Sequence, residues 1–442
     1  MSPMSTRSDL KRPLAVVILA GGQGKRLGVD GPKVLAPMCG SPSLAYVLDA
    51  AEALVPDRIV VVVCFEKEKV ESYLASEKRA LEVVTADQVE ALGTGHAVLK
   101  AHPGLDDFDG DVLVLFGDGP LVRPETLDWL VREHQNTDAV CSLATAVLDD
   151  PTSYGRIVRS DRDELVAVVE QKDADEETLR IQEVHCGIAV FRSAALFPAL
   201  ARLGNDNAQG EYYLTDVYGL LCQDGGVVRP MVMDGVEDAL GFNRPEELLE
   251  IRGRIRRRIL TKHQSQGVQI EDPATVYIDR DVTIGAGTHI FPFTVIRGPV
   301  QIGSGCEVGP FTHLRAGARL HDGAQVGNFV EVKNSELGEG VKANHLTYLG
   351  DTTIGPETNV GAGTITANYD GKAKHRTTIG RDVFVGSGSI LVAPIEVGDG
   401  ALIGAGAVVT KGRPVQPGEV VVGVPARPLK KKSSEPSSEE GR

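Results

Sequence analysis

The sequence is poor in aromatic residues and contains no long apolar run. Phenylalanine, tyrosine and tryptophan make up 5% of its 442 residues, whereas glycine occurs 50 times. This composition favours tight turns and short strands over a large aromatic core. The apolar run LAVVILA, from Leu14 to Ala20, is far too short to cross a bilayer. The first dozen residues, MSPMSTRSDLKR, lack the apolar stretch of a signal peptide. We therefore expect neither membrane insertion nor secretion.

Positive charge is also in short supply. Lys and Arg number 46 against 61 Asp and Glu, which leaves a net charge of −15 at pH 7. This balance argues against general affinity for nucleic acid or an anionic membrane, although a few local cations can still bind phosphate. The six cysteines include no C-x-x-C pair, and several lie in apolar runs. These features predict a protein of the reducing cytoplasm that has no nucleic-acid partner.

A chain of this length exceeds what one hydrophobic core usually organises, so two domains are expected. Over residues 14–243, buried-type strands alternate with segments of helical period, which predicts a doubly wound, Rossmann-like α/β domain. Ligands of such domains bind at the carboxyl ends of the strands. Residues 244–265 form a charged amphipathic pattern that predicts a helical linker arm.

The pattern then changes to a period of six. Aliphatic residues recur at every sixth position from Ile278 to Val332, and the register slips by one at Leu337. The period resumes later and runs from Ile379 to Val409, often with glycine after the aliphatic residue. Hexapeptide repeats of this kind predict a left-handed parallel β-helix over residues 266–430. The polar tails, residues 1–13 and 431–442, are predicted to be disordered.

A glycine-rich loop, LAGGQGKRLG, follows the first predicted strand. It lacks the dinucleotide fingerprint G-x-G-x-x-G because Leu27 stands at the last position, and the chain has no P-loop. Backbone amides of such a loop suit phosphate oxygens, and Lys25, Arg26 and Lys33 add positive charge. A phosphate-binding loop and a plain strand-to-helix turn both fit this segment taken alone.

Further motifs follow in one order: PKVL, ALGTGHA, FGDGPL, SYGRIVR, VEQKDA, NAQGEYYLTDV and GFNRPEE, then PFTHLRAGARL, GNFVEVKNSELGEGVKANHLTYLGD and NVGAGTITANYDGKAKHRTTIG. Together they resemble the bifunctional N-acetylglucosamine-1-phosphate uridylyltransferase/glucosamine-1-phosphate acetyltransferase (GlmU) family. The resemblance implies acetylation of glucosamine-1-phosphate by acetyl-CoA. UMP then passes from UTP to N-acetylglucosamine-1-phosphate with release of pyrophosphate. The product of this family feeds peptidoglycan and lipopolysaccharide synthesis.

The resemblance assigns roles in the N-terminal half. Arg26 and Lys33 would neutralise phosphates as catalytic residues, and Asp118 and Asn243 would hold Mg²⁺, which prefers oxygen ligands. A turn-forming Asp118 and a surface Lys33 are the structural alternatives. The residues implied for nucleotide and sugar binding are Leu19, Ala20, Gly21, Gly22, Lys33, Gln88, Gly93, Thr94, Asp118, Gly155, Glu170, His185 and Asn243.

One departure from the family concerns the sugar. The chain has His185-Cys186-Gly187 where the family usually has Asn-Thr-Gly in contact with the acetamido sugar. Histidine is bulkier and lacks the paired donor and acceptor of an amide. A different activated sugar and a purely structural His185 both remain open.

In the C-terminal half the resemblance assigns His345 as the catalytic base. An amine nucleophile must lose a proton as it attacks, and a neutral imidazole suits that role. The residues implied for binding the sugar phosphate are Arg315, Glu331, Lys333, Tyr348, Asn359 and Lys374. Those implied for acetyl-CoA are Ala362, Asn368, Tyr369, Ser387 and Ala405. Gly423 stands where the family often has Arg, and Arg427 or Lys430 is the possible substitute.

The interruption of the period by TANYDGKAKHRTT implies a homotrimer, because this loop reaches a neighbouring subunit in the family.

Besides the bifunctional enzyme and the same enzyme with a different sugar, a third hypothesis is a binding or assembly module with an inactive nucleotidylyl half. Loss of key residues would be expected in that case, yet none of five is missing: Arg26, Lys33, Asp118, Glu170 and Asn243.

Overall fold

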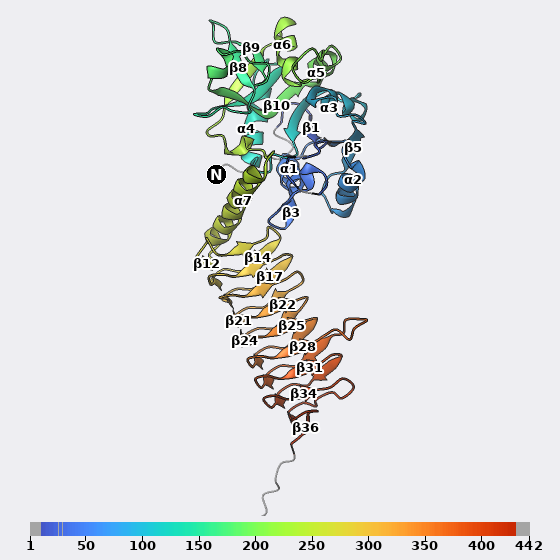
Figure 1. The fold of residues 1–442 in the computed structure, drawn as a ribbon, viewed down its shortest axis with the longest axis vertical. Coiled ribbons are helices and arrows are strands. Elements are labelled where there is room, and N and C mark those ends of the chain that lie inside the picture. The colour runs from blue at the N-terminus through green and yellow to red at the C-terminus, as the bar shows by residue number, and fades with distance from the viewer. Residues whose placement is uncertain (1–9, 25, 29, 430–442) are drawn as a thin grey trace, which may run out of the picture. The chain divides into compact units, whose positions relative to one another are not determined.

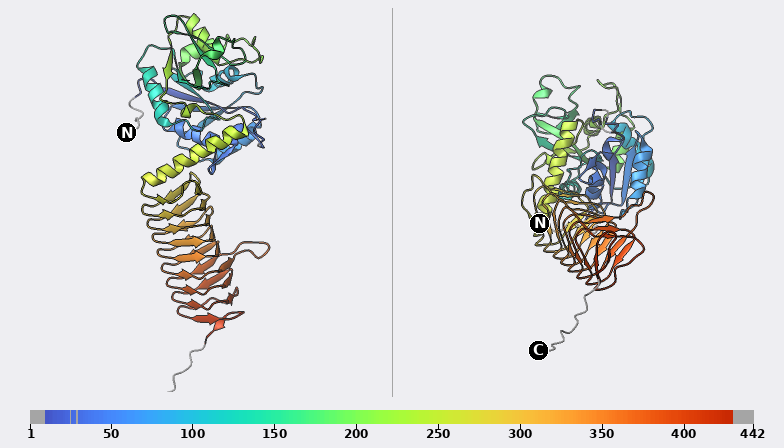
Figure 2. Two further views of the ribbon diagram at one scale, coloured as in Figure 1. Left: turned by 60° about the vertical axis from the view of Figure 1, so that its left-hand side comes forward. Right: turned by 60° about the horizontal axis from the view of Figure 1, so that its bottom comes forward.

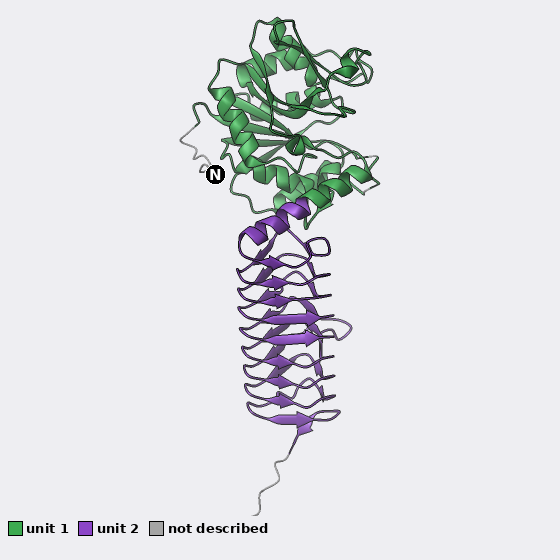
Figure 3. Cartoon of the chain, turned by 90° about the vertical axis from the view of Figure 1, so that its left-hand side faces the viewer, with its two compact units in different colours: residues 1–254 green, residues 255–442 purple. Residues whose placement is uncertain are grey.

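The computed structural model describes residues 10–24, 26–28 and 30–429, and the chain divides into two compact units, residues 1–254 and 255–442 (Figure 3). The predicted C-terminal tail, residues 431–442, lies outside the described residues, as does most of the predicted N-terminal tail. In the described part of the chain, no helix is both long and apolar enough to cross a membrane.

The first unit is built on one twisted sheet (Figure 1). Its strands follow the order β11 (Val228–Val232), β7 (Cys141–Val147), β10 (Glu183–Arg192), β6 (Asp111–Phe116), β1 (Leu14–Leu19), β4 (Arg58–Val63) and β5 (Val83–Asp87). Strand β1 lies parallel to both β6 and β4, whereas β10 runs antiparallel to β6 and β7. A hairpin of β8 (Arg156–Arg159) and β9 (Leu165–Val169) pairs with β10. Strands β4 and β5 lie on one side of β1, and β6 lies on the other, so the strand order reverses at β1. Such a switch point leaves a crevice at the carboxyl ends of the strands.

Helices cover both faces of this sheet because alternate strand residues point to opposite sides. Val16 and Ile18 belong to one buried cluster, and Ala15 and Val17 belong to another. The first cluster includes apolar residues of α1 (Ser43–Glu52), α2 (Lys67–Ser76) and α4 (Pro124–Gln135). The second includes residues of α3 (Thr94–Lys100), α5 (Ser193–Leu200) and α6 (Thr215–Gln223). A short hairpin, β2 (Pro37–Met38) with β3 (Ser41–Pro42), precedes α1.

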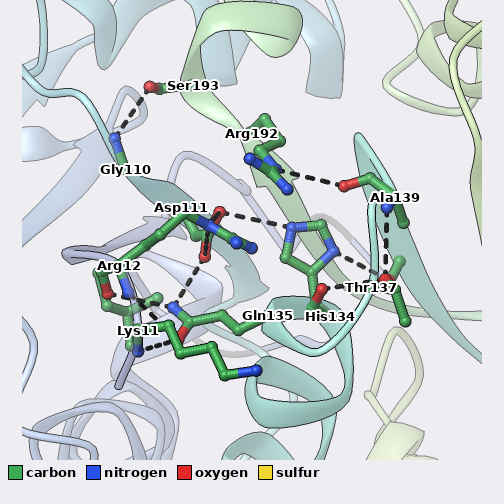
Figure 4. Close-up of polar contacts among 12 residues, drawn as sticks. Lys11, Arg12, Gly110, Asp111, His134, Gln135, Thr137, Ala139, Arg192 and Ser193 are labelled. Atoms are coloured by element: carbon green, nitrogen blue, oxygen red, sulfur yellow. Dashed lines mark hydrogen bonds and ion pairs between the residues drawn. The ribbon is translucent and has the colours of Figure 1, made fainter.

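Residues 10–13, predicted as part of a disordered tail, are ordered against the sheet. Arg12 Nε lies 3.1 Å from both carboxylate oxygens of Asp111, and the backbone amide of Lys11 donates to Gln135 Oε1 at 2.8 Å. Figure 4 shows Asp111 between Arg12, His134 and Gln135. Burial alone would raise the pKa of Asp111, but hydrogen bonds from His134 and Arg12 lower it. The predicted α/β domain, which begins at residue 14, therefore leaves out residues that anchor the first strand.

Helix α7 (Pro245–Ser265) crosses the division between the units, and the β-helix follows it. Its coils place short strands on three sheets, and the strands pair in parallel except at the C-terminal end of the first sheet (Figure 1). The first sheet contains β12 (Gln269–Ile270), β15 (His289–Ile290), β18 (Glu307–Val308), β21 (Gln325–Asn328), β24 (Lys342–His345), β27 (Asn359–Val360), β30 (Phe384–Val385), β33 (Leu402–Ile403), β35 (Val420–Val422) and β36 (Arg427–Pro428). The second contains β13 (Tyr277–Ile278), β16 (Val295–Ile296), β19 (His313–Leu314), β22 (Glu331–Lys333), β25 (Tyr348–Gly350), β28 (Ile365–Ala367), β31 (Ile390–Val392) and β34 (Val408–Val409). The third contains β14 (Val282–Ile284), β17 (Val300–Ile302), β20 (Arg319–Leu320), β23 (Glu336–Leu337), β26 (Thr352–Ile354), β29 (Thr377–Ile379) and β32 (Ile395–Val397).

Three of the six-residue repeats make one coil of this stack. Ile278 pairs with Ile296, 18 residues further along, and both side chains are buried in one continuous core. Glycine follows such residues because the next coil leaves no room for a side chain: a Cβ on Gly285 would lie 2.6 Å from the backbone of Ser304. The predicted fold, a Rossmann-like domain followed by a left-handed β-helix, is confirmed.

The interruption in the period forms a loop that projects from the stack (Figure 2, in orange). Val360 pairs with Val385, 25 residues further along, so this coil is longer than the first ones. Within the loop, Asp370 Oδ2 lies 2.7 Å from His375 Nε2, and Asp370 Oδ1 accepts the amides of Lys372 and Ala373. These backbone and side-chain hydrogen bonds lower the pKa of Asp370. The loop is therefore tied internally into a hairpin.

Candidate functional site

The carboxyl ends of β1 and β6 open onto two cavities of about 570 Å³ and 250 Å³. Lys33, Phe116 and Asp118 line both of them. The glycine-rich loop after β1 and the Gly117–Asp118 turn after β6 converge here because the two strands are parallel neighbours. The two cavities can therefore hold two reactants whose reacting groups meet at this shared wall.

Lys33 lies at the centre of the shared wall. Its Nζ forms an ion pair with Asp118 Oδ2 and donates to Asn243 Oδ1 at 2.8 Å. The amide of Lys33 donates to the carbonyl of Gly22 at 3.2 Å, which holds the glycine-rich loop beside it. An ammonium between a carboxylate and an amide oxygen shows that this position suits a cation. Lys33, Asp118 and Asn243, predicted as site residues and far apart in the sequence, are thus brought together.

The smaller cavity is lined by several of the residues predicted for the nucleotide. Gln88 is buried, and its Nε2 donates to the carbonyl of Gly93 at 3.0 Å. Gly93 has φ 112°, and a Cβ there would lie 2.5 Å from the carbonyl oxygen of Tyr212, so only glycine fits. Thr94 Oγ1 accepts the amide of Leu214 at 3.0 Å. Leu19, Gly21 and Gly22 also line this cavity, whereas Ala20 is buried and Arg26 is exposed outside both linings.

The larger cavity has a more acidic lining. Gly155, Glu170 and His185 line it, as predicted for a sugar site, and so do Asp118 and Asn243. Burial raises the pKa of Glu170, although a hydrogen bond from Thr215 at 3.2 Å opposes this effect. A carboxylate at this position can accept hydrogen bonds from hydroxyl groups of a ligand.

His185 is anchored by a residue that sequence reasoning missed. The hydroxyl of Tyr218, on α6, lies 2.9 Å from His185 Nε2. The Tyr218 ring stacks on Phe191 with 5.7 Å between ring centroids, and Tyr218 is fully buried. Burial lowers the pKa of His185 to about 4, so its imidazole is neutral near pH 7. Tyr218 occupies a core position of a helix, and nothing in the sequence connects it to position 185.

In the second unit, residues predicted for catalysis and for acetyl-CoA form one column. His345, Ala362, Ser387 and Ala405 occupy equivalent turns of successive coils, linked by backbone hydrogen bonds from Gly363 to His345, Gly388 to Ala362 and Gly406 to Ser387. His345 ends β24 and is exposed, as are Ser387 and Ala405. The period of the repeat therefore produces a continuous edge of small residues below an exposed imidazole.

Beside this column, three cations come together: Arg315 and Lys333 at the second sheet, and Lys374 on the projecting loop. Arg315 Nη1 lies 2.7 Å from Glu331 Oε1, and Glu331 is paired with Tyr348 on the next coil. The pKa of Lys333 is lowered, chiefly because the ammonium of Lys374 lies beside it, with Arg315 adding to the effect. The loop thus carries Lys374 back to a group of like charges that would accept an anion.

Other predicted residues are more scattered. Asn359 lies on the first sheet, next to Lys342 and Phe384, and so belongs to a different face from Glu331. Asn368 is buried and donates to Asp351, while Tyr369 is exposed on the loop. Gly423 has φ 89° in the turn between β35 and β36, and Arg427, the first residue of β36, is exposed; Lys430 lies outside the described residues.

Known proteins match both halves. The family model of a MobA-like NTP transferase domain matches residues 16–217, and that of the bacterial transferase hexapeptide matches residues 281–316 and 376–411. The bifunctional protein GlmU of Symbiobacterium thermophilum is 40% identical, with 90% of this chain and 90% of that protein covered. The GlmU proteins of Geobacillus thermodenitrificans and Mycobacterium tuberculosis are 38% and 39% identical, over 89% and 92% of this chain and 92% and 89% of theirs.

This chain belongs to the GlmU family. The resemblance inferred from the motifs is confirmed, and so are the two enzyme classes. The protein is a bifunctional enzyme, with a uridylyltransferase in its first unit and an acetyltransferase in its second. As a GlmU protein it belongs to the synthesis of cell-wall precursors, and the hypothesis of an inactive binding module is set aside.

Proposed function

We propose that this GlmU protein acetylates glucosamine-1-phosphate and then transfers UMP from UTP to the acetylated product, in the cytoplasm that supplies UTP and acetyl-CoA. The observation that carries the uridylyl step is the shared wall between the two cavities, where Lys33 and Asp118 lie. UTP would occupy the smaller cavity and the sugar phosphate the larger one. The sugar phosphate oxygen would then attack the α-phosphorus at this wall.

Both reactants are anions, so the chain must mainly position them and neutralise charge. Lys33 is held in place by Asp118 and Asn243 and faces the meeting point of the cavities. Arg26 is exposed on the loop above and would add a second positive charge as the phosphates bind. Gln88 and the backbone around Gly93 would contact the uracil base.

The oxygens around Lys33 also suit Mg²⁺. Asp118 and Asn243 provide a carboxylate and an amide oxygen at one point, which is the ligand chemistry that Mg²⁺ prefers. Among the described residues no group of three or more His, Cys, Asp or Glu side chains could hold a metal ion. An ion held by these two residues would take its remaining ligands from phosphates and water, and would help to neutralise the phosphate charge.

For the acetyl step, His345 would take the proton that the amine of glucosamine-1-phosphate loses on attack. Arg315, Lys333 and Lys374 would bind the phosphate of that sugar, because a dianion relieves the repulsion between the neighbouring lysines. The column of Ala362, Ser387 and Ala405 would receive acetyl-CoA, since its small side chains leave space along the edge.

A homotrimer would complete the acetyltransferase site. Phe293, Phe311, Phe329 and Leu346 form a column at one edge of the β-helix, and each has a positive φ between 48° and 57°. Their exposed fractions run from 47% to 63%, and the aromatic rings stack at 4.9 Å and 5.2 Å between centroids. An exposed apolar column in strained backbone, directly beside His345, supports a partner copy on this edge.

Two assays test the proposal. Purified protein with UTP, Mg²⁺ and a panel of sugar-1-phosphates should release pyrophosphate fastest with N-acetylglucosamine-1-phosphate. With acetyl-CoA and glucosamine-1-phosphate it should release free CoA. Absence of pyrophosphate with every sugar would overturn the uridylyl assignment.

Sedimentation tests the trimer. Phe311→Ser should shift the sedimentation from trimer toward monomer, whereas Gln301→Ser, an exposed change on the third sheet, should not.

A further inference from the structure

Ser43, the first residue of α1, contacts both of the segments that form the shared wall between the cavities. Its backbone amide donates to the carbonyl of Ala36 at 3.1 Å, just after the short helical turn that begins at Lys33. Its hydroxyl donates to the carbonyl of Gly117 at 2.8 Å, one residue before Asp118. Ser43 is fully buried. One buried residue is therefore bonded to both of the loops that bring Lys33 and Asp118 together.

The carbonyl that the Ser43 hydroxyl binds belongs to the peptide group of Asp118. A peptide group is planar, so the oxygen of Gly117 and the amide nitrogen of Asp118 turn together. The hydrogen bond to this oxygen thus holds the plane that leads into Asp118. Through that plane, the Ser43 hydroxyl controls the direction in which the Asp118 side chain leaves the backbone.

The peptide group on the other side of Gly117 is held by the sheet instead. The amide of Gly117 donates to the carbonyl of Leu19 at 2.9 Å. A Cβ on Gly117 would lie 3.1 Å from that carbonyl oxygen and 2.9 Å from the side chain of Val34, so the backbone is closely packed here. The peptide before Gly117 is therefore fixed by β1, whereas the peptide after it depends on Ser43.

We propose that Ser43 is a positioning residue for uridylyl transfer, which holds the Asp118 carboxylate against Lys33 at the point where the two reactants meet. This inference rests on the proposed function and adds a residue that lines neither cavity and acts only through Asp118. Asp118 forms an ion pair with Lys33, and Lys33 also donates to Asn243 at 2.8 Å. A rotation of the Asp118 peptide would open this arrangement.

Loss of the Ser43 hydroxyl takes a hydrogen-bond partner from the buried carbonyl of Gly117, and an unpaired buried carbonyl is unfavourable. Its neighbours Phe116 and Asp118 both line the cavities, so the carbonyl would turn toward them to reach water. The Asp118 amide would turn with it, and the carboxylate would lie opposite Lys33 in fewer molecules. Chemistry should slow as a result, while the contacts of the uracil base with Gln88 stay in place.

The experiment compares Ser43→Thr with Ser43→Val in the full-length protein. The two side chains have the same shape and crowd the site equally, but only threonine keeps the hydroxyl. The kcat of pyrophosphate release should be about tenfold lower in Ser43→Val than in Ser43→Thr, as is usual when a carboxylate at a cation site loses the group that orients it. KM for UTP and the rate of acetyl transfer should be the same in both variants.

Hydrogen exchange provides a readout that needs no substrate. In Ser43→Ala the amides of residues 117–119 should exchange about tenfold faster than in the wild type, since local opening no longer breaks this hydrogen bond. The matched control is Ser142→Ala, which removes another buried hydroxyl of the same unit, bonded to His134 Nδ1 at 2.9 Å and outside both cavities. The control should change neither kcat nor exchange at residues 117–119.

The outcomes separate this inference from the proposed function. A wild-type protein that releases no pyrophosphate with any sugar would overturn the proposed function. In an active protein, equal kcat for Ser43→Thr and Ser43→Val would overturn only the role of Ser43. Unchanged exchange at residues 117–119 in Ser43→Ala would also overturn it, because the hydroxyl would then not hold the Asp118 peptide.

Discussion

The two units place their functional residues by different means. In the β-helix, His345, Ala362 and Ser387 lie in register because each occupies the same position of a repeated coil. In the α/β unit, Lys33, Asp118 and Asn243 come from three separate segments and meet only after the sheet has formed. The site of the β-helix is therefore specified by the local sequence repeat, whereas the site of the α/β unit depends on the order of the strands in the sheet. A substitution that removes one functional side chain should therefore lower the activity of its own unit and leave the activity of the other unit unchanged.

The largest effect is expected from Asp118→Asn. This change removes the carboxylate that would hold Mg²⁺ beside Lys33, and the lost cation would have supplied several kcal/mol of charge stabilisation at the reacting phosphates. Pyrophosphate release should fall on the order of 10⁴-fold, while CoA release stays normal. Asp106→Asn, an exposed loop change, should leave both assays unaltered. Near-normal uridylyl transfer in Asp118→Asn would place the cation site elsewhere.

The corresponding change in the second unit is His345→Ala. Loss of a general base should lower acetyl transfer about 10²–10⁴-fold, with uridylyl transfer and acetyl-CoA affinity little changed. Lys342→Ala, on the same strand and also exposed, provides the control. If His345→Ala acetylates at the parent rate with the same pH profile, another group is the base.

A glycine that stacks on the next coil should tolerate a methyl group less well than a glycine in an open turn. Gly285→Ala would push a Cβ to 2.6 Å from the next coil, so the second unit should lose about 1–3 kcal/mol of stability. Gly204→Ala, in the first unit, meets nothing within 4 Å and should change stability by no more than about 0.5 kcal/mol. Thermal unfolding of the two variants compares these values directly, and equal shifts would contradict the stacking argument.

Acid should weaken the first unit through His185. Burial lowers the pKa of His185 from 6.5 to about 4, so below pH 6.5 the unfolded chain binds a proton that the folded chain does not. Stability should therefore fall between pH 6.5 and 4, by about 2 kcal/mol at pH 5, since one pKa unit is worth about 1.4 kcal/mol. His185→Asn should flatten this dependence, and His321→Asn, an exposed change in the other unit, should not. A dependence that is unaltered in His185→Asn would show that other groups cause it.

What the sequence could predict follows the same division. The six-residue period predicted the β-helix because one coil determines the next, whereas the resemblance of its motif assigned His345. The parallel strands around β1 were predicted from their apolar runs. The antiparallel β10 between β6 and β7 was not, because its neighbours are chosen by packing between distant segments.

Two contacts of single residues could not be predicted from the sequence, and the reason is the same for both. Tyr218 looks like an ordinary core residue of a helix, and its hydrogen bond to His185 exists only in the folded unit. Arg12 lies in a polar segment that reads as a tail, yet its partner Asp111 is fully buried at the start of β6. Neither contact has a local pattern, since each joins segments that are far apart in the chain.

The spacing between paired strands has a consequence for the order of folding. Each early coil of the β-helix closes over 18 residues, as from Ile278 to Ile296. The first unit instead joins Lys11 to Gln135, which are 124 positions apart. Short closures cost little chain entropy and can propagate coil by coil, whereas distant pairings must wait for a long segment to collapse. Refolding experiments that follow the two units separately should find the β-helix forming first, although it emerges last from the ribosome.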